Sequence, residues 1–286
     1  MRLATIKLDG VEVAAVSVPD RGFCPVPALG DDLPADLLGI IEAGLHGELR
    51  ERLERTSVEA APDQLVMPDQ ASFGPLFRNP QKIWGIGLNY RAHADDLGQV
   101  HPDEPASFIK GNHTIIGPGD DIELPSVSHH VTSEAELGLV FGERCEDVEE
   151  PEALRTLVGV CPILDQTAVD ILERNPRFLT RSKNFRTFFS FGPVLVTLDE
   201  ALGSDGTLNH LTVGTYSNGQ VYREDVVANM AHGPEHLISL HSKMMPFYPG
   251  DVISSGSPGG VRVEDGDVAE CCIPGIGTLK NPVRRR

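Results

Sequence analysis

From residue 83 to the end, the chain consists of short apolar runs separated by Gly, Pro and Asp. Runs such as IWGIG, AELGLVFG, VGVCPIL, GPVLVTL and VAECCI have the length of single strands. Asn218-Gly219 between two such runs is typical of a two-residue hairpin turn. In this part of the chain, helical periodicity is confined to four short segments: residues 90–98, 151–157, 166–174 and 226–243. These segments do not alternate regularly with the strand-like runs. This pattern disfavours a nucleotide-binding parallel sheet and predicts a β-rich α+β fold.

The first part of the chain has a different pattern. Two alternating apolar runs flank Asp9-Gly10, which predicts a β-hairpin. Large aliphatic residues recur every fourth position over 33–53, which predicts an amphipathic helix weakened by three glycines within it. Four prolines within 58–80 then mark a boundary. We therefore expect a small N-terminal α+β domain followed by a larger β-rich domain: residues 1–75 and 76–286.

The charge balance excludes two classes of partner. The chain has 24 Lys and Arg against 42 Asp and Glu, a formal net charge of −18. Non-specific binding to nucleic acid or to anionic lipid needs the opposite sign, so neither is expected. No apolar run has the length of a membrane span, and the N-terminus lacks the apolar stretch of a signal peptide. The five cysteines include no CxxC pair, which fits free thiols in a reducing compartment, so we expect a cytoplasmic protein. We also expect its ligand to be a small molecule.

Carboxylates provide the first candidate site. In a strand over 133–141, Glu134 and Glu136 point to one face and the apolar residues between them to the other. Two adjacent carboxylates suit a hard divalent cation such as Mg²⁺, Mn²⁺ or Ca²⁺, although a solvated strand face gives the same pattern. Asp165 follows the run VGVCPIL and is either a helix cap or a third ligand. Lys183 lies among several phenylalanines, which favours a partly buried lysine paired with these carboxylates.

A candidate general base precedes this region. If residues 90–98 are helical, His93 and Asp96 lie on one face, and a carboxylate beside an imidazole raises its basicity. A surface His–Asp pair has the same spacing.

Two further patterns are weaker. Residues 232 and 236 have the histidine spacing of a zinc helix, but Gly233-Pro234 disturbs it. The glycine-rich segment 255–260 lacks the lysine of a P-loop, but its hydroxyl and amide groups can hold a carboxylate.

Taken in order, the segments over residues 80–283 resemble the fumarylacetoacetate hydrolase family. The resemblance implies a catalytic β-roll, often preceded by a small N-terminal domain, and a homodimer. It is carried by eight stretches in the same order: KIWGIGLNYRAHADD, SFIKGNHTIIGPGDDIELP, SEAELGLVFG, GVCPILDQTAVD, RSKNFRTFFSFGPVLVT, NGQVYREDVVANM, PGDVISSGSPGGV and IPGIGTLKNPV.

The resemblance also implies roles for individual residues, with Mg²⁺ or Mn²⁺ as the cofactor. It implies three metal ligands, a catalytic lysine, a His–acid pair and four substrate-binding residues: Glu134, Glu136 and Asp165; Lys183; His93 and Asp96; Lys110, Ser255, Gly256 and Ser257. The family pattern has Arg where this chain has Val169 and Asn where it has Leu164. These departures leave the substrate open.

The implied activity is metal-dependent hydrolysis of a carbon–carbon bond in an acylpyruvate or β-diketo acid. His93, aided by Asp96, would activate water, and the metal and Lys183 would stabilise the enolate that leaves. An isomerase, tautomerase or decarboxylase acting on a hydroxymuconate-type or oxaloacetate-type acid could use the same site. A non-catalytic keto-acid binding protein is the third alternative, favoured only by Val169.

Overall fold

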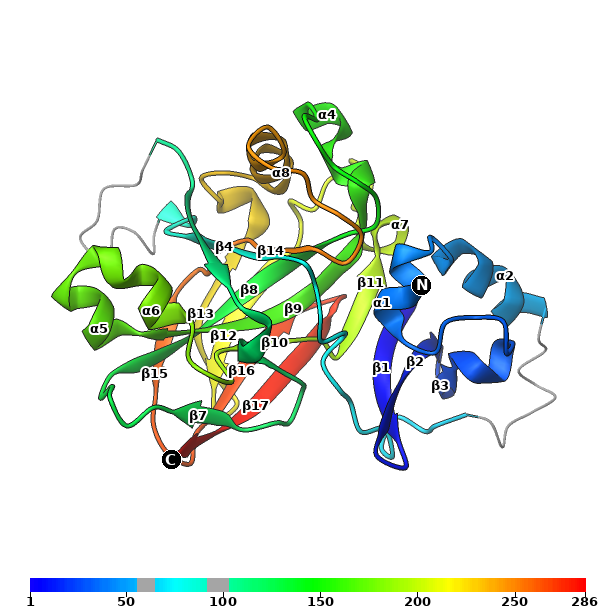
Figure 1. Ribbon diagram of the computed structural model, residues 1–286, viewed down its shortest axis with the longest axis horizontal. Coiled ribbons are helices and arrows are strands. Elements are labelled where there is room, and N and C mark those ends of the chain that lie inside the picture. The colour runs from blue at the N-terminus through cyan, green and yellow to red at the C-terminus, as the bar shows by residue number, and fades with distance from the viewer. Residues whose placement is uncertain (56–64, 92–102) are drawn as a thin grey trace.

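Two β-sheets dominate the computed structural model, which describes residues 1–55, 65–91 and 103–286 (Figure 1). The larger sheet has this strand order: β3 (Gly22–Pro25), β2 (Val11–Val18), β1 (Arg2–Leu8), β11 (Val194–Thr197), β9 (Leu157–Ala168), β8 (Val131–Phe141), β14 (Val252–Ser254), β4 (Ile83–Gly87) and β5 (Ala106–Lys110). Three short strands pair at its side: β6 (Ile115–Ile116), β10 (Phe189–Phe191) and β15 (Gly260–Val263). The smaller sheet has this order: β13 (Gln220–Val226), β12 (Thr212–Ser217), β16 (Val268–Ile273), β17 (Gly277–Arg285) and β7 (Ile122–Leu124).

The long antiparallel pair β8–β9 lies at the centre of the larger sheet. Every residue of β9 is buried, and its sequence is correspondingly apolar over most of its length. The smaller sheet packs against one face of this pair through β12, β16 and β17. Fully buried side chains such as Ala135, Leu137, Leu164, Cys271 and Leu279 belong to the core cluster that includes both sheets. The opposite face of β8 and β9 is therefore the one available for polar side chains.

The N-terminal segment extends the larger sheet. Strands β1 and β2 form the predicted hairpin, with Asp9 and Gly10 at positive φ in its turn. Strand β1 then pairs with β11, so that Leu3 lies opposite Leu195. Together with α1 (Leu37–Glu42) and α2 (His46–Arg55), this segment lies at one end of the molecule (Figure 1). The division between residues 75 and 76 stays a prediction.

Several helices differ from the sequence expectations. The periodic stretch over 33–53 is divided between α1 and α2, because Gly44 between them has a φ of +67° and ends the first helix. The segment expected over 226–243 is helical only at η7 (Val227–Asn229) and α8 (Pro234–Ser242). Proline is favoured in the first turn of a helix and disrupts its interior, so Pro234 begins α8 where one long helix was expected.

The other expected helices are shorter than predicted or lie partly outside the described residues. The helix over 151–157 is present as α4 (Glu150–Ala153) and η5 (Leu154–Thr156). Residues 166–168 belong to β9, and α5 (Val169–Arg174) follows. Residues 92–98 lie outside the described part. The remaining helical elements are short: η1 (Val26–Leu29), η4 (Asn112–Thr114), η6 (Pro176–Phe178), α6 (Leu179–Lys183) and α7 (Leu198–Ala201). Among the described helices, none has the length and apolar character needed to cross a membrane.

The close approach of β9 to β11 gives a stability prediction. A Cβ atom added at Gly159 would lie 2.1 Å from the backbone oxygen of Val196, so Gly159→Ala must separate two paired strands. We expect it to lower the free energy of unfolding by about 3 kcal/mol. The matched control is Gly47→Ala in α2, where a Cβ meets nothing within 4 Å. That variant should be stabilised by less than about 1 kcal/mol. Urea unfolding measures both, and equal effects would contradict the packing described here.

Candidate metal centre and active site

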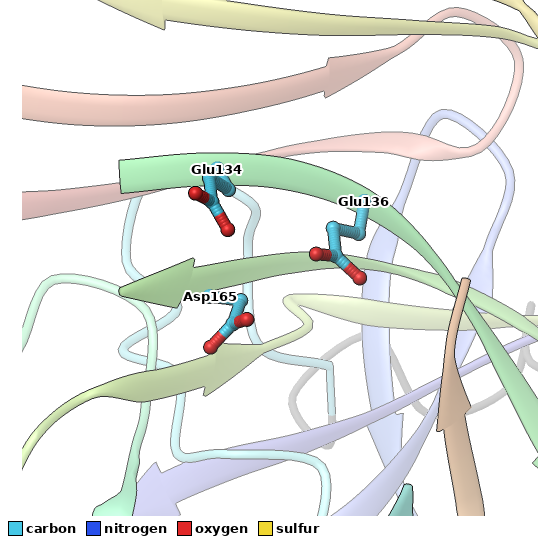
Figure 2. Close-up of side chains that lie close together, drawn as sticks. All are labelled: Glu134, Glu136 and Asp165. Atoms are coloured by element: carbon cyan, nitrogen blue, oxygen red, sulfur yellow. The ribbon is translucent and has the colours of Figure 1, made fainter. Parts of the chain in front are cut away.

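The pairing of β8 with β9 brings three carboxylates together. Glu134 lies directly opposite Asp165, and Glu136 lies two residues further along the same strand. Residues opposite one another and residues two apart share a face of a sheet, so all three side chains point the same way (Figure 2). One oxygen from each lies within 4.8 Å of the others. This all-oxygen set has the chemistry and the spacing that a hard divalent cation requires.

Burial decides between the alternatives left open by the sequence. Glu136 and Asp165 are fully buried and Glu134 is half-buried, so the two glutamates do not form a solvated strand face. Asp165 lies inside β9, three residues before the strand ends, so it is not a helix cap. In a candidate metal centre, three such buried carboxylates can serve as ligands.

Two lysines neutralise part of this negative charge. The Lys183 ammonium, at the end of α6, donates to Glu134 Oε2 at 2.6 Å and to Asp165 Oδ2 at 2.5 Å. The Lys110 ammonium, at the end of β5, donates to the other oxygen of Asp165. Both lysines are buried, and Lys183 lies 4.7 Å from the ring centroid of Phe108. The expected pairing of Lys183 with the carboxylates is therefore present in the fold.

Burial and the neighbouring charges shift the pKa values of three groups in this cluster. Burial and the neighbouring Asp165 carboxylate raise the pKa of Glu136 to about 8. Burial opposes the charged form of Lys183, but Asp165 and Glu134 outweigh it and raise the pKa of this lysine. Burial lowers the pKa of Lys110 despite its contact with Asp165. A proton on Glu136 therefore offsets part of the negative charge of the three carboxylates, and a divalent cation that takes its place would have an all-oxygen set of ligands.

The end of β14 and the loop that follows it supply hydrogen bonds to Glu136. Ser254 lies opposite Gly138 and Gly260 lies opposite Glu134, so the chain leaves the edge of β8 between these two points. There Ser254 Oγ donates to Glu136 Oε2 at 2.5 Å, and the Gly256 amide donates to the same oxygen at 2.8 Å. The position of Gly256 requires glycine, because its φ is +94°.

The two hydroxyls predicted to bind substrate differ in whether they have a hydrogen-bond partner. The Ser255 hydroxyl is buried and has no hydrogen-bond partner among the described residues. The Ser257 hydroxyl instead donates to the carbonyl of Gly259 at 3.1 Å. The substrate-binding role of both hydroxyls stays a prediction.

Some functional contacts were missed by the sequence reasoning. Ser254 Oγ and the hydroxyls of Thr132 and Thr167 contact the carboxylates, the two threonines donating to Glu134 Oε1 at 3.3 and 3.2 Å. The alternation of β8 places Thr132 on the face of Glu134 and could have identified it. The contacts of Ser254 and Thr167 depend on pairing between distant strands.

Two further predictions concern the His93–Asp96 pair and the histidine pair near residue 234. His93 and Asp96 lie outside the described residues. The imidazoles of His232 and His236 stack with centroids 5.2 Å apart, and His236 contacts Glu150 at 2.8 Å. Within residues 1–55, 65–91 and 103–286, the acidic triad is the one group of three with metal-ligand spacing. A zinc site at these histidines is therefore not supported.

Sequence comparison defines the family. Residues 82–284 match the family described as "Fumarylacetoacetate (FAA) hydrolase C-terminal", and the chain belongs to this family of enzymes. It is 34% identical to Rv2993c of Mycobacterium tuberculosis over 87% of this chain and 95% of that protein. It is 30% identical to the human mitochondrial oxaloacetate tautomerase FAHD2A, over 92% of this chain and 84% of that protein.

Solved structures confirm the predicted β-rich α+β fold of this family. The 5-carboxymethyl-2-hydroxymuconate delta-isomerase from Mycobacterium smegmatis superposes with a TM-score of 0.76 at 27% identity, covering 100% of this chain and 99% of that one. Maleylpyruvate hydrolase from Sphingobium sp. SYK-6, solved with manganese(II) and pyruvate, gives a TM-score of 0.79 at 24% identity. It covers 100% of this chain and 99% of the other, and at this identity it shows the shared fold alone.

The raised pKa of Glu136 gives a prediction for cation binding. Below about pH 8 this carboxyl holds a proton, which must leave when a cation binds. We expect Mn²⁺ affinity to increase from pH 6 to pH 8, by up to about tenfold per pH unit for one released proton. Isothermal titration calorimetry in buffers of different ionisation enthalpy measures the affinity and the proton release together.

The control for this measurement separates the triad from other acidic residues. Glu136→Gln should weaken Mn²⁺ binding and remove most of its pH dependence, because no proton remains to be displaced there. Glu173→Gln changes an exposed carboxyl on α5 and should bind as the wild type does. A pH-independent affinity in the wild type would contradict the electrostatics described for Glu136.

Proposed function

We propose that this enzyme forms and stabilises the enol of a 2-oxo acid, with keto–enol tautomerisation of an oxaloacetate-type acid as its reaction. The observation that carries the proposal is the buried cluster of three carboxylates and two lysines on one face of β8 and β9. The oxaloacetate tautomerases among the relatives, 30–35% identical to this chain, support this choice of reaction.

Glu134, Glu136 and Asp165 would hold the divalent cation, which we propose to be Mg²⁺ or Mn²⁺. When bound, such a cation would act as a Lewis acid that withdraws electron density from the substrate carbonyl. The hydrogen bonds from Ser254 and Gly256 to Glu136 Oε2 fix the orientation of that carboxylate. The hydroxyls of Thr132 and Thr167 do the same for Glu134.

The lysines supply positive charge where the oxygen of an enolate would carry negative charge. Lys183 lies between Glu134 and Asp165, and these carboxylates keep its ammonium protonated. A buried ammonium of this kind stabilises charge on a substrate oxygen more strongly than it would in water. Lys110, on the other side of Asp165, is proposed to line the substrate site. The Ser255 hydroxyl and the segment Gly256–Ser257 would hold the carboxylate at the far end of the substrate.

Hydrolysis of a carbon–carbon bond in an acylpyruvate is the second candidate. It uses the same enol stabilisation but adds an attacking water, for which His93 with Asp96 would be the general base. The spacing of these two residues in the sequence favours this reaction. Decarboxylation of the keto form of oxaloacetate would release CO₂ and leave the enolate of pyruvate, which the same charges would stabilise.

A non-catalytic role is disfavoured by membership in a family of enzymes.

A homodimer and a cytoplasmic location stay predictions. Size-exclusion chromatography with light scattering tests the dimer.

A substrate panel tests the proposed reaction. With Mg²⁺ present, wild-type enzyme should speed the loss of the enol absorbance of oxaloacetate, and Lys183→Met should reduce this rate by at least about 100-fold. Lys243→Met changes an exposed lysine and should keep the wild-type rate. Incubation with acetylpyruvate, followed by NMR, distinguishes hydrolysis by the appearance of acetate and pyruvate. Cleavage of acetylpyruvate without acceleration of oxaloacetate tautomerisation would replace the first candidate by the second.

A further inference from the structure

Asn89 is a buried side chain with hydrogen bonds to two distant segments of the chain. It follows β4, is 1% exposed, and precedes Tyr90, which forms an isolated bridge with Met230. Its amide nitrogen donates to the carbonyl of His232 at 3.0 Å and to the carbonyl of Ser255 at 2.8 Å. Its amide oxygen accepts from the backbone N–H of His232 at 3.0 Å. Both donor hydrogens of the amide and its oxygen are therefore used.

The hydrogen bond from Asn89 to the carbonyl of Ser255 holds one end of the peptide group that joins Ser255 to Gly256. The carbonyl of Ser255 accepts from Asn89, and the N–H of Gly256, in the same peptide group, donates to Glu136 Oε2 at 2.8 Å. A peptide group is planar and its carbonyl and N–H point in opposite directions when it is trans. Holding the carbonyl in place therefore aims the N–H, and the polarisation of each bond strengthens the next.

The packing around this peptide allows little adjustment. A Cβ atom added at Gly256 would lie 2.7 Å from Asn89 Cβ and 3.2 Å from the backbone oxygen of Ile86. The Ser255 amide donates to the carbonyl of Leu137 at 3.1 Å, which ties the other side of the loop to β8. The peptide is thus fixed between β8 and the residues that follow β4.

We propose that Asn89 is a positioning residue for the metal centre: through the Ser255–Gly256 peptide it sets the orientation of Glu136 and thereby the affinity for the cation. This rests on the proposed function in one respect, since it requires Glu136 to be a metal ligand. Asn89 contacts neither the cation nor the substrate in this assignment. Groups that orient metal ligands in this way contribute about 10- to 100-fold to metal affinity.

The test compares two asparagines that make the same kind of bond. Asn281 in β17 is also fully buried, and its amide nitrogen donates to the carbonyls of Gly117 and Asp120, both at 2.8 Å. Asn89→Ala and Asn281→Ala should both lower the melting temperature. Mn²⁺ titration followed by EPR should show about 10- to 100-fold weaker binding in Asn89→Ala and wild-type binding in Asn281→Ala.

A second variant keeps the test usable if Asn89→Ala does not fold. Asn89→Asp keeps the size of the side chain and the acceptor for His232 N–H but removes both donors, so it should weaken Mn²⁺ binding by at least as much. Wild-type affinity in either folded Asn89 variant, or equal weakening in Asn281→Ala, overturns the inference. If Glu136→Gln abolishes binding while Asn89→Ala preserves it, the inference alone fails. If Glu136→Gln itself binds Mn²⁺ normally, the metal centre of the proposed function fails with it.

Discussion

The register between β8 and β9 is the constraint on which the site depends. It places Asp165 opposite Glu134, and a shift of one residue would turn Asp165 towards the apolar core between the sheets. The core holds the register in place, because Ala135, Leu137 and Leu164 are fully buried on the opposite face of the same strands. The apolar residues of β8 and β9 therefore fix both the packing of the two sheets and the positions of the three carboxylates.

Burying three carboxylates together costs free energy. The fold offsets this cost with two lysine ammonium groups and with hydrogen-bond donors. Lys110 and Lys183 arrive from the ends of β5 and α6, on different sides of Asp165. The last residue of β14 and the loop after it each supply one donor to Glu136. Burying an ion pair contributes little net stability, so this cluster is better explained by function than by folding. Membership in a family of enzymes, one relative of which is an oxaloacetate tautomerase, is consistent with that explanation.

Local patterns in the sequence predicted the local features of the fold. Asp9-Gly10 and Asn218-Gly219 form the expected hairpin turns, because their positive φ values are requirements of single positions. The length of helices was harder to predict. The end of α1 at Gly44 and the start of α8 at Pro234 override the apolar periodicity that continues through them. Asp165 was open to two interpretations, because the end of β9 depends on its pairing with β8 up to Ala168.

The sequence alone determined that Glu134 and Glu136 share a face, since alternation along a strand needs no knowledge of its partner. It also determined the family, through eight short segments in a fixed order. Only the tertiary structure decided that Glu136 is buried and that two lysines contact different oxygens of Asp165. It also decided that Ser254 donates to Glu136 and that Asn89 donates to the peptide group whose N–H does the same. The reason is physical: these contacts join residues 18 to 166 positions apart, and their geometry depends on how the strands and loops pack together.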